Sequence, residues 1–344
     1  MAGSTVEDVA WLALDSPSSA GAARRAASTL AHDLGLPESR AAEVGLAVTE
    51  IAGNAYRHAG GGALLLRAVR ASDSAAVEVV AVDTGPGIPD VERARRDGHS
   101  TGGTLGIGLG AVERLSDHLQ ISSGNGGGTV VVARFEGDRR ARPTLTEDAS
   151  VPPAAGITRA LLGESACGDA YAVRRDGRRV TLMVADGSGH GPLAAAAAQQ
   201  AVREFTAGTR PPGPPEAMAA IHHALRGTRG AAVAIAELDV AAGRLRYVGV
   251  GNIAGNVIGP DGARGLVSIG GIAGYREPTI KVFEYPLSAG SVVVMHSDGV
   301  SQRWGAKSLA ELPSPSPLVV GATVLRDAGT RRDDACVLVG RAAG

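Results

Sequence analysis

The stretch Gly85–Leu115, GPGIPDVERARRDGHSTGGTLGIGLGAVERL, holds two groups of glycines and leads into a helix expected near Gly108–Leu119. Just before it, the apolar run Val79–Val82 is typical of a strand and leads into Asp83. Glycines let a backbone approach a ligand closely, and a helix N-terminus favours an anion, so Gly102–Gly110 is typical of a phosphate-binding loop. A carboxylate at a strand end can accept a hydrogen bond from an exocyclic amine. The stretch therefore predicts a nucleotide site.

This site has to work without a P-loop. The chain has only two lysines, Lys281 and Lys307, and neither follows a glycine-rich loop, so a Walker A motif is absent. We therefore expect backbone N–H groups, arginine and a metal ion to hold the phosphates. The formal net charge of −1 also argues against a broad basic surface, and we expect neither nucleic acid nor a membrane as a partner.

Length and cysteine usage set the broad class of protein. The 344 residues suggest two domains, each able to bury a core. The two cysteines, Cys167 and Cys336, are too few for a disulfide framework or a four-cysteine zinc site. We see no signal peptide and no apolar run of ~18 residues. A cytoplasmic protein is expected.

A predicted helix from Pro37 to about His58 carries a polar stripe. Glu50, Asn54 and His58 are spaced i, i+4, i+8 and drift slowly around the helix, beside an apolar stripe. Taken alone, such a stripe is more simply a solvated polar face. The apolar stripe consists of Val44, Val48, Ile51 and Ala55.

Four pieces then follow in one order: the polar stripe, Asp83–Gly87 (DTGPG), the Gly102–Gly110 loop, and Gly126–Thr129 (GGGT) before a strand. Together they resemble the GHKL (Bergerat-fold) ATPase family over about residues 5–136. More narrowly, Gly85–Leu115 looks like the switch serine kinases of the bacterial stressosome, of RsbT type.

The resemblance implies a role for each piece. Asn54 would hold Mg²⁺ with ATP, Asp83 would read the adenine amine, and Glu50 would be the catalytic base that takes the proton from the attacking hydroxyl. The implied ATP-binding set is Asn54, His58, Asp83, Gly85, Gly87, Gly102, Gly103, Thr104, Leu105, Gly106, Gly108 and Thr129.

In the second half, acidic residues stand at strand ends. Asp169 precedes one expected strand, Asp186 and Asp298 each follow one and precede glycine, and Asp333-Asp334 precedes the last. A single Asp-Gly is usually a turn. Four such places together fit a cluster of hard oxygen ligands for Mg²⁺ or Mn²⁺, since no Cys/His set competes. Two such metals could ionise a bridging water for attack on phosphorus.

As an ordered set these aspartates resemble the metal-dependent serine/threonine phosphatases in their bacterial SpoIIE-like branch, and most nearly the RsbX type, over about residues 154–341. Three further stretches carry the likeness: Leu225–Gly230 (LRGTRG), Tyr247–Asn252 (YVGVGN) and Met295–Gly299 (MHSDG).

The likeness also implies the ligands. Asp186 would be catalytic and bridge two metals, with the Gly187 carbonyl on one of them and Asp298 and Asp334 on the other. Asp169 would lie close by through water. Asp333 could replace Asp334, a third metal is left open, and His190 would lie beside the ligands or in packing.

The fold class that follows is α+β in two domains. Residues 1–137 are expected to form a Bergerat α/β sandwich, with helices on one face of a mixed sheet. A polar, proline-containing linker spans 138–153, and 154–344 are expected to form an α-β-β-α sandwich of phosphatase (PPM) type.

The sequence thus predicts a bifunctional partner-switching regulator that uses ATP, Mg²⁺ and Mn²⁺. A serine/threonine kinase domain and a phosphatase domain would act on STAS-domain antagonist proteins of a stress-response or sigma-factor pathway, and a homodimer is allowed for. In the alternative, the first domain is a nucleotide-dependent module that captures a partner without transferring phosphate.

Overall fold

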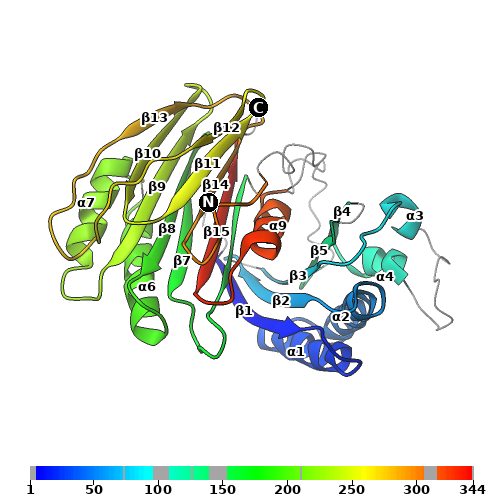
Figure 1. Cartoon of the computed structure of the whole chain (residues 1–344). Helices are drawn as coiled ribbons and strands as arrows, with labels where there is room; N and C mark the ends of the chain where they lie inside the picture. The colour runs from blue at the N-terminus through cyan, green and yellow to red at the C-terminus, as the bar shows by residue number, and fades with distance from the viewer. Residues whose placement is uncertain are drawn as a thin grey trace. The chain divides into compact units, whose positions relative to one another are not determined.

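A computed structural model describes residues 5–72, 74–95, 108–124, 127–138, 153–209, 211–305 and 316–342. The chain divides into two compact units, Met1–Thr146 and Glu147–Gly344. Most of the expected linker 138–153 lies outside the described residues. Both units mix helices and strands, which confirms the α+β class (Figure 1). Within the described residues, no helix is both long enough and apolar enough to cross a bilayer.

The first unit is one five-stranded sheet with two long helices on one face (Figure 1). The strand order is β1-β2-β3-β5-β4. The elements are β1 (Thr5–Ala13), α1 (Ser19–Asp33), α2 (Glu38–Ala59), β2 (Ala63–Arg70), β3 (Ala75–Asp83), α3 (Val91–Arg95), α4 (Gly108–Leu115), β4 (His118–Ser123) and β5 (Thr129–Glu136).

Every neighbouring pair in this sheet is antiparallel, whereas we expected a mixed sheet. The topology explains the difference. Along the chain β4 follows β3, but β4 is the edge strand of the sheet and does not pair with β3. The β4–β5 return then places β5 between them, antiparallel to both, so that β3 and β4 share a direction without pairing.

The helix expected to run from Gly108 to about Leu119 ends earlier, at Leu115. The Ser116 hydroxyl donates to the Val112 carbonyl at 2.8 Å, and the Asp117 N–H donates to the Arg134 carbonyl of β5 at 2.8 Å. The sheet thus takes up the backbone groups that would have continued the helix.

The second unit is a two-sheet sandwich with helices outside each sheet, as expected (Figure 1). The strand orders are β13-β10-β9-β8-β7 and β12-β11-β14-β15-β6. The elements are β6 (Ala154–Arg159), β7 (Asp169–Asp176), β8 (Arg179–Gly187), α6 (Pro192–Thr206), α7 (Pro214–Ala224), β9 (Ala231–Asp239), β10 (Arg244–Val250), β11 (Ala254–Gly259), β12 (Gly262–Gly265), β13 (Phe283–Pro286), β14 (Val292–His296), α9 (Pro317–Ala328) and β15 (Ala335–Arg341).

Alternation along the strands divides the core of this unit. Leu182 and Val184 of β8 face the second sheet, whereas Met183 and Ala185 pack against α6 and α7. On the other side α9 packs against β15 and β6. The sequence did not lead us to expect α9, because its run PLVVGATVLRDA holds β-branched residues and a glycine, which favour other structures.

Candidate functional site

The polar residues on the stripe of α2 become more exposed toward the C-terminal end of the helix. The Glu50 side chain is 19% exposed, Asn54 is half-buried, and His58 is exposed. The apolar stripe beside it is buried, as expected. Glu50 Oε2 is buried and, among the described residues, has no hydrogen-bond partner. Burying a carboxylate oxygen without a donor is costly, so this atom is suited to accepting a proton or a donor from a ligand.

Arg57 lies directly on the expected metal ligand, and sequence reasoning missed it. Its Nη2 donates to Asn54 Oδ1 at 2.9 Å and lies 4.0 Å from Glu50 Oε2. Gly53 leaves room for this arrangement, because a Cβ at that position would lie 3.1 Å from Arg57 Nη1. A glycine inside a helix next to an arginine one turn on is the signal that could have found it.

Asp83 ends β3 inside a tight, braced turn. Its Oδ1 accepts from the Gly85 N–H at 2.9 Å and from the Thr129 N–H at 3.1 Å. Gly128 has a φ of +69°, and a Cβ there would overlap the Asp83 carbonyl, so glycine is required for this approach. Both hydrogen bonds go to Oδ1, which leaves Oδ2 to accept from a ligand.

Of the other residues expected to bind ATP, some lie within the described residues and some lie outside them. Gly108 opens α4, and the Thr129 hydroxyl lies 3.0 Å from the Ser123 hydroxyl. Gly87 belongs to the turn after Asp83. The rest of the expected phosphate loop, Gly102, Gly103, Thr104, Leu105 and Gly106, lies outside the described residues.

In the second unit, Asp169 and Asp186 face each other across one strand pair. Asp169 opens β7, Asp186 lies near the end of β8, and the two are partners in the antiparallel register. The Gly187 N–H donates to the Gly168 carbonyl at 3.0 Å and holds the two strand ends together.

The other aspartates come from the second sheet. Asp298 follows β14 and Asp334 precedes β15, and because these neighbours are antiparallel both lie at the same edge. Gly299 packs so closely that a Cβ would overlap the Asp334 carbonyl oxygen. The buried Ser297 hydroxyl donates to Asp169 Oδ2 at 2.6 Å and links the two sheets.

These carboxylates act on one another electrostatically. Burial, and then the charge of Asp186, raises the pKa of Asp169 well above its ordinary value. Burial, and then Asp298, raises the pKa of Asp186 to about 7. Burial and Asp333 also raise the pKa of Asp298. Like charges in a poorly solvated place favour the protonated forms, and a bound cation would remove this penalty.

The cluster fits a divalent cation by its donor set and by one orphaned atom. Asp334 is 2% exposed, and its Oδ2 is buried with no hydrogen-bond partner among the described residues. Its Oδ1 accepts from the Leu161 N–H at 2.8 Å. Asp333 is less buried, but its charge acts on Asp186 and Asp298, so both neighbours stay candidates.

These aspartate side chains do not form a complete set of ligands around one point. Within the described residues, no three His, Cys, Asp or Glu side chains are placed to hold one metal ion. The carboxylates instead bond to neutral donors, Asp298 Oδ2 to Asn252 Nδ2 at 2.7 Å and Asp169 to Ser297. Asn252 ends the YVGVGN stretch, but the sequence did not reveal its role.

His190 pairs with a carboxylate that is not one of the strand-end aspartates. Its Nδ1 is 2.6 Å from Glu164 Oε1, and the imidazole is well exposed in the loop between Gly187 and α6. The expectation that it lies beside the ligands or in packing stays a prediction.

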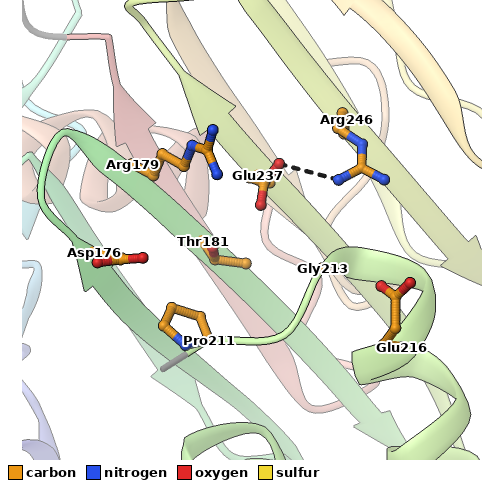
Figure 2. Close-up of a pocket in the computed structure, with 8 residues that line it drawn as sticks. All are labelled: Asp176, Arg179, Thr181, Pro211, Gly213, Glu216, Glu237 and Arg246. Carbon is orange, nitrogen blue, oxygen red and sulfur yellow. Dashed lines mark hydrogen bonds and ion pairs between the residues drawn. The ribbon is translucent and has the colours of Figure 1, made fainter. Parts of the chain in front are cut away.

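A polar pocket of about 350 Å³ opens at the opposite end of the same strands (Figure 2). Asp176 ends β7 and Arg179 begins β8, so the β7–β8 turn places this pocket away from Asp169 and Asp186. Figure 2 shows Arg246 paired with Glu237. Their closest nitrogen and oxygen atoms are 3.3 Å apart. None of the expected site residues lines it. The lining is Asp176, Arg179, Thr181, Pro211, Gly213, Glu216, Glu237 and Arg246.

Comparison with known proteins separates the two units. Residues 14–135 match the family model described as histidine kinase-like ATPase domain, and residues 176–342 match that of stage II sporulation protein E (SpoIIE). The serine/threonine-protein kinase RsbT of Bacillus subtilis (strain 168) is 38% identical over 112 residues, which cover 33% of this chain and 84% of RsbT.

Two solved structures are also similar to this chain. One, from work on "the bacterial stressosome: a modular system that has been adapted to control secondary messenger signaling", is 32% identical with a TM-score of 0.52, over 55% of this chain and 98% of that one. RsbX in complex with magnesium is 20% identical with a TM-score of 0.47, over 54% of this chain and 93% of that one.

Proposed function

The chain belongs to the RsbT-type histidine kinase-like ATPases through its first domain and to the SpoIIE phosphatases through its second, and on this premise we propose a bifunctional partner-switching regulator. Its first domain would bind ATP and phosphorylate a protein serine or threonine. Its second domain would hydrolyse phosphoserine or phosphothreonine. The observation that carries the second activity is the meeting of strand-end aspartates from two sheets around the orphaned Asp334 Oδ2.

The second domain would hold Mg²⁺ or Mn²⁺ through Asp186, the Gly187 carbonyl, Asp298 and Asp334 or Asp333, with Asp169 close by. The bound ions would supply an ionised water and neutralise charge on the phosphoryl group. The chain itself orients the ligands. Ser297 fixes Asp169, and Asn252 fixes Asp298.

In the first domain, the proposed base is Glu50, whose Oε2 has no hydrogen-bond partner in the part of the chain that the structure describes and can accept the proton of an attacking hydroxyl. Asp83 would accept from the adenine amine through Oδ2. Asn54 would hold Mg²⁺ once Arg57 leaves its Oδ1. The rest of the transfer depends on positioning and charge neutralisation.

The proposed substrates are STAS-domain phosphoproteins. This proposal rests on the likeness to RsbT and to a structure from stressosome work. A kinase and a phosphatase in one chain consume ATP without net effect unless a partner or signal favours one of them. Partner switching supplies such control, since each phosphorylation state would bind a different protein.

One observation favours the rival, in which the first domain binds nucleotide and partner without chemistry. The Asn54 oxygen is engaged by Arg57, so the site as it stands favours a guanidinium over a metal ion there. Incubation with ATP labelled at the γ-phosphate and a STAS protein distinguishes the two functions. Label on a serine or threonine of that protein supports the kinase, whereas nucleotide-dependent capture without label supports the rival.

The phosphatase has its own test. The full chain with Mn²⁺ should release inorganic phosphate from a phosphoserine peptide, and excess EDTA should stop the release. If phosphate release is absent, or continues unchanged in EDTA, the proposed phosphatase function is wrong.

A further inference from the structure

His296, the last residue of β14, is buried and hydrogen bonded at both ring nitrogens. It is 1% exposed, with Nδ1 2.9 Å from the Ser297 carbonyl and Nε2 3.2 Å from Trp304 Nε1. A carbonyl only accepts and an indole N–H only donates. The imidazole is therefore neutral, with its proton on Nδ1, and the two rings meet edge to face at 6.1 Å and 75°.

The residue after His296 connects three strands. Ser297 is 0% exposed, and its hydroxyl donates to Asp169 Oδ2 while accepting from the Cys336 N–H at 2.9 Å. A serine hydroxyl has a single proton, and here that proton is donated to Asp169. Because the hydroxyl oxygen also accepts from the Cys336 N–H, the direction of the O–H bond is set by Cys336 and by the position of the Ser297 backbone.

The segment after Ser297, as far as Trp304, is held by backbone hydrogen bonds near its start and by Trp304 at its end. The Thr330 N–H donates to the Gly299 carbonyl at 2.7 Å, and the Ser301 N–H donates to the Ala328 carbonyl at 2.9 Å. Trp304, 9% exposed, then folds back to the end of β14 through its bond to His296.

We propose that Trp304 and His296 are positioning residues for the metal centre of the second domain. Trp304 fixes the imidazole, the imidazole fixes the Ser297 carbonyl, and this peptide sets both the Ser297 hydroxyl on Asp169 and the direction of Asp298. Neither side chain bonds to an aspartate of the cluster. This inference rests on the proposed phosphatase function.

The direct test is Trp304→Phe, which keeps an aromatic ring and removes the indole N–H. Loss of partners that orient metal ligands typically weakens metal binding ~10–100-fold. We expect the Mn²⁺ concentration for half-maximal hydrolysis of a phosphoserine peptide to rise at least ~10-fold, with kcat at saturating Mn²⁺ nearly unchanged. Calorimetric Mn²⁺ titration should show the same weakening. A generally damaged fold would lower kcat instead.

The chain offers a matched control, because Trp11 and Trp304 are its only tryptophans. Trp11→Phe, in β1 of the first domain, should leave the Mn²⁺ midpoint unchanged. In that variant Trp304 is the sole tryptophan, so Mn²⁺ binding should quench its fluorescence with the midpoint seen in the activity titration.

His296→Asn supplies a second variant if Trp304→Phe does not fold. Its amide nitrogen can still donate to the Ser297 carbonyl, but the shorter side chain has no acceptor at the position of Nε2, where Trp304 donates. We expect the same shift of the Mn²⁺ midpoint, and a double variant no worse than the worse single one, since both changes remove one interaction.

The outcomes separate this inference from the proposed function. A wild type without metal-dependent hydrolysis overturns the function itself. Metal-dependent hydrolysis in the wild type, together with unchanged Mn²⁺ midpoints in Trp304→Phe or His296→Asn, overturns the positioning role alone. An absence of Mn²⁺ quenching of Trp304 would also count against it.

Discussion

The guanidinium of Arg57 donates to Asn54 Oδ1 at 2.9 Å, on the oxygen expected to bind Mg²⁺. Arg57→Ala should free that oxygen. We expect the Mg²⁺ concentration needed for ATP binding to fall severalfold, measured by calorimetry with ATP over a range of Mg²⁺. Gly53→Ala provides an independent check, because its Cβ would crowd the guanidinium. Unchanged Mg²⁺ dependence in both variants would mean that Arg57 and the metal do not compete.

Asp83→Asn should weaken ATP binding strongly. It replaces one carboxylate oxygen by an amide N–H₂, which cannot accept from an exocyclic amine. Asn54→Ala should also weaken Mg·ATP binding by removing the ligand oxygen. Phosphatase activity of the second domain serves as the control and should stay near the wild-type rate. Wild-type ATP affinity in both variants, by calorimetry, contradicts the assignment.

Glu50→Gln separates binding from chemistry. The amide keeps the size of the side chain but cannot take a proton. ATP should bind as in the wild type, whereas phosphoryl transfer to a STAS protein should fall ~10²–10⁴-fold, the usual contribution of a general base. Transfer at the wild-type rate would exclude Glu50 as the base.

Asp186→Asn should abolish phosphoserine hydrolysis, because it removes the carboxylate that would bridge the metals. Folding should survive, since the amide removes charge repulsion within the cluster. We expect a melting temperature in EDTA no lower than that of the wild type, and unchanged ATP binding. Hydrolysis at the wild-type rate would mean that Asp186 only forms a turn.

The stability of the metal-free second domain should depend on pH in a defined direction. Burial and the charge of Asp298 raise the pKa of folded Asp186 to about 7, whereas the ordinary pKa of an aspartate is 3.8. Between these values the folded chain binds more protons than the unfolded chain, so the free energy of unfolding decreases as pH rises. In EDTA, Trp304 fluorescence of Trp11→Phe should report a lower melting temperature at pH 8 than at pH 5. An equal or higher value at pH 8 would contradict this.

Local pattern was enough to predict where the candidate site residues lie on single helices and strands. The 3.6-residue period placed Glu50 and Asn54 on one stripe of α2, and apolar runs before Asp186 and Asp298 placed both at strand ends. The residues that support them were missed because their roles arise only from tertiary contacts. Asn252 and Ser297 reach the aspartates across 46 and 128 residues of chain.

The same limit applies to the elements. The helix α9 was missed because packing against β15 and β6 overrides the local preference of its β-branched residues. The end of α4 was placed too late because β5 recruits the Asp117 N–H, a partner that no local pattern reveals.

The bond between Ser297 and Asp169 joins the two sheets of the sandwich, and the proposed metal centre would join them a second time at the same place. Asp169 and Asp186 lie on strands of one sheet, whereas Asp298 follows and Asp334 precedes a strand of the other. A cation held by Asp186 and Asp298 would therefore hold the two sheets in one relative position, and at 100 times its Kd it would add ~2.7 kcal/mol to the stability of that arrangement. Linkage is reciprocal. A protein that binds anywhere on this domain and shifts one sheet against the other would loosen the cation, and could thus turn hydrolysis off from a distance.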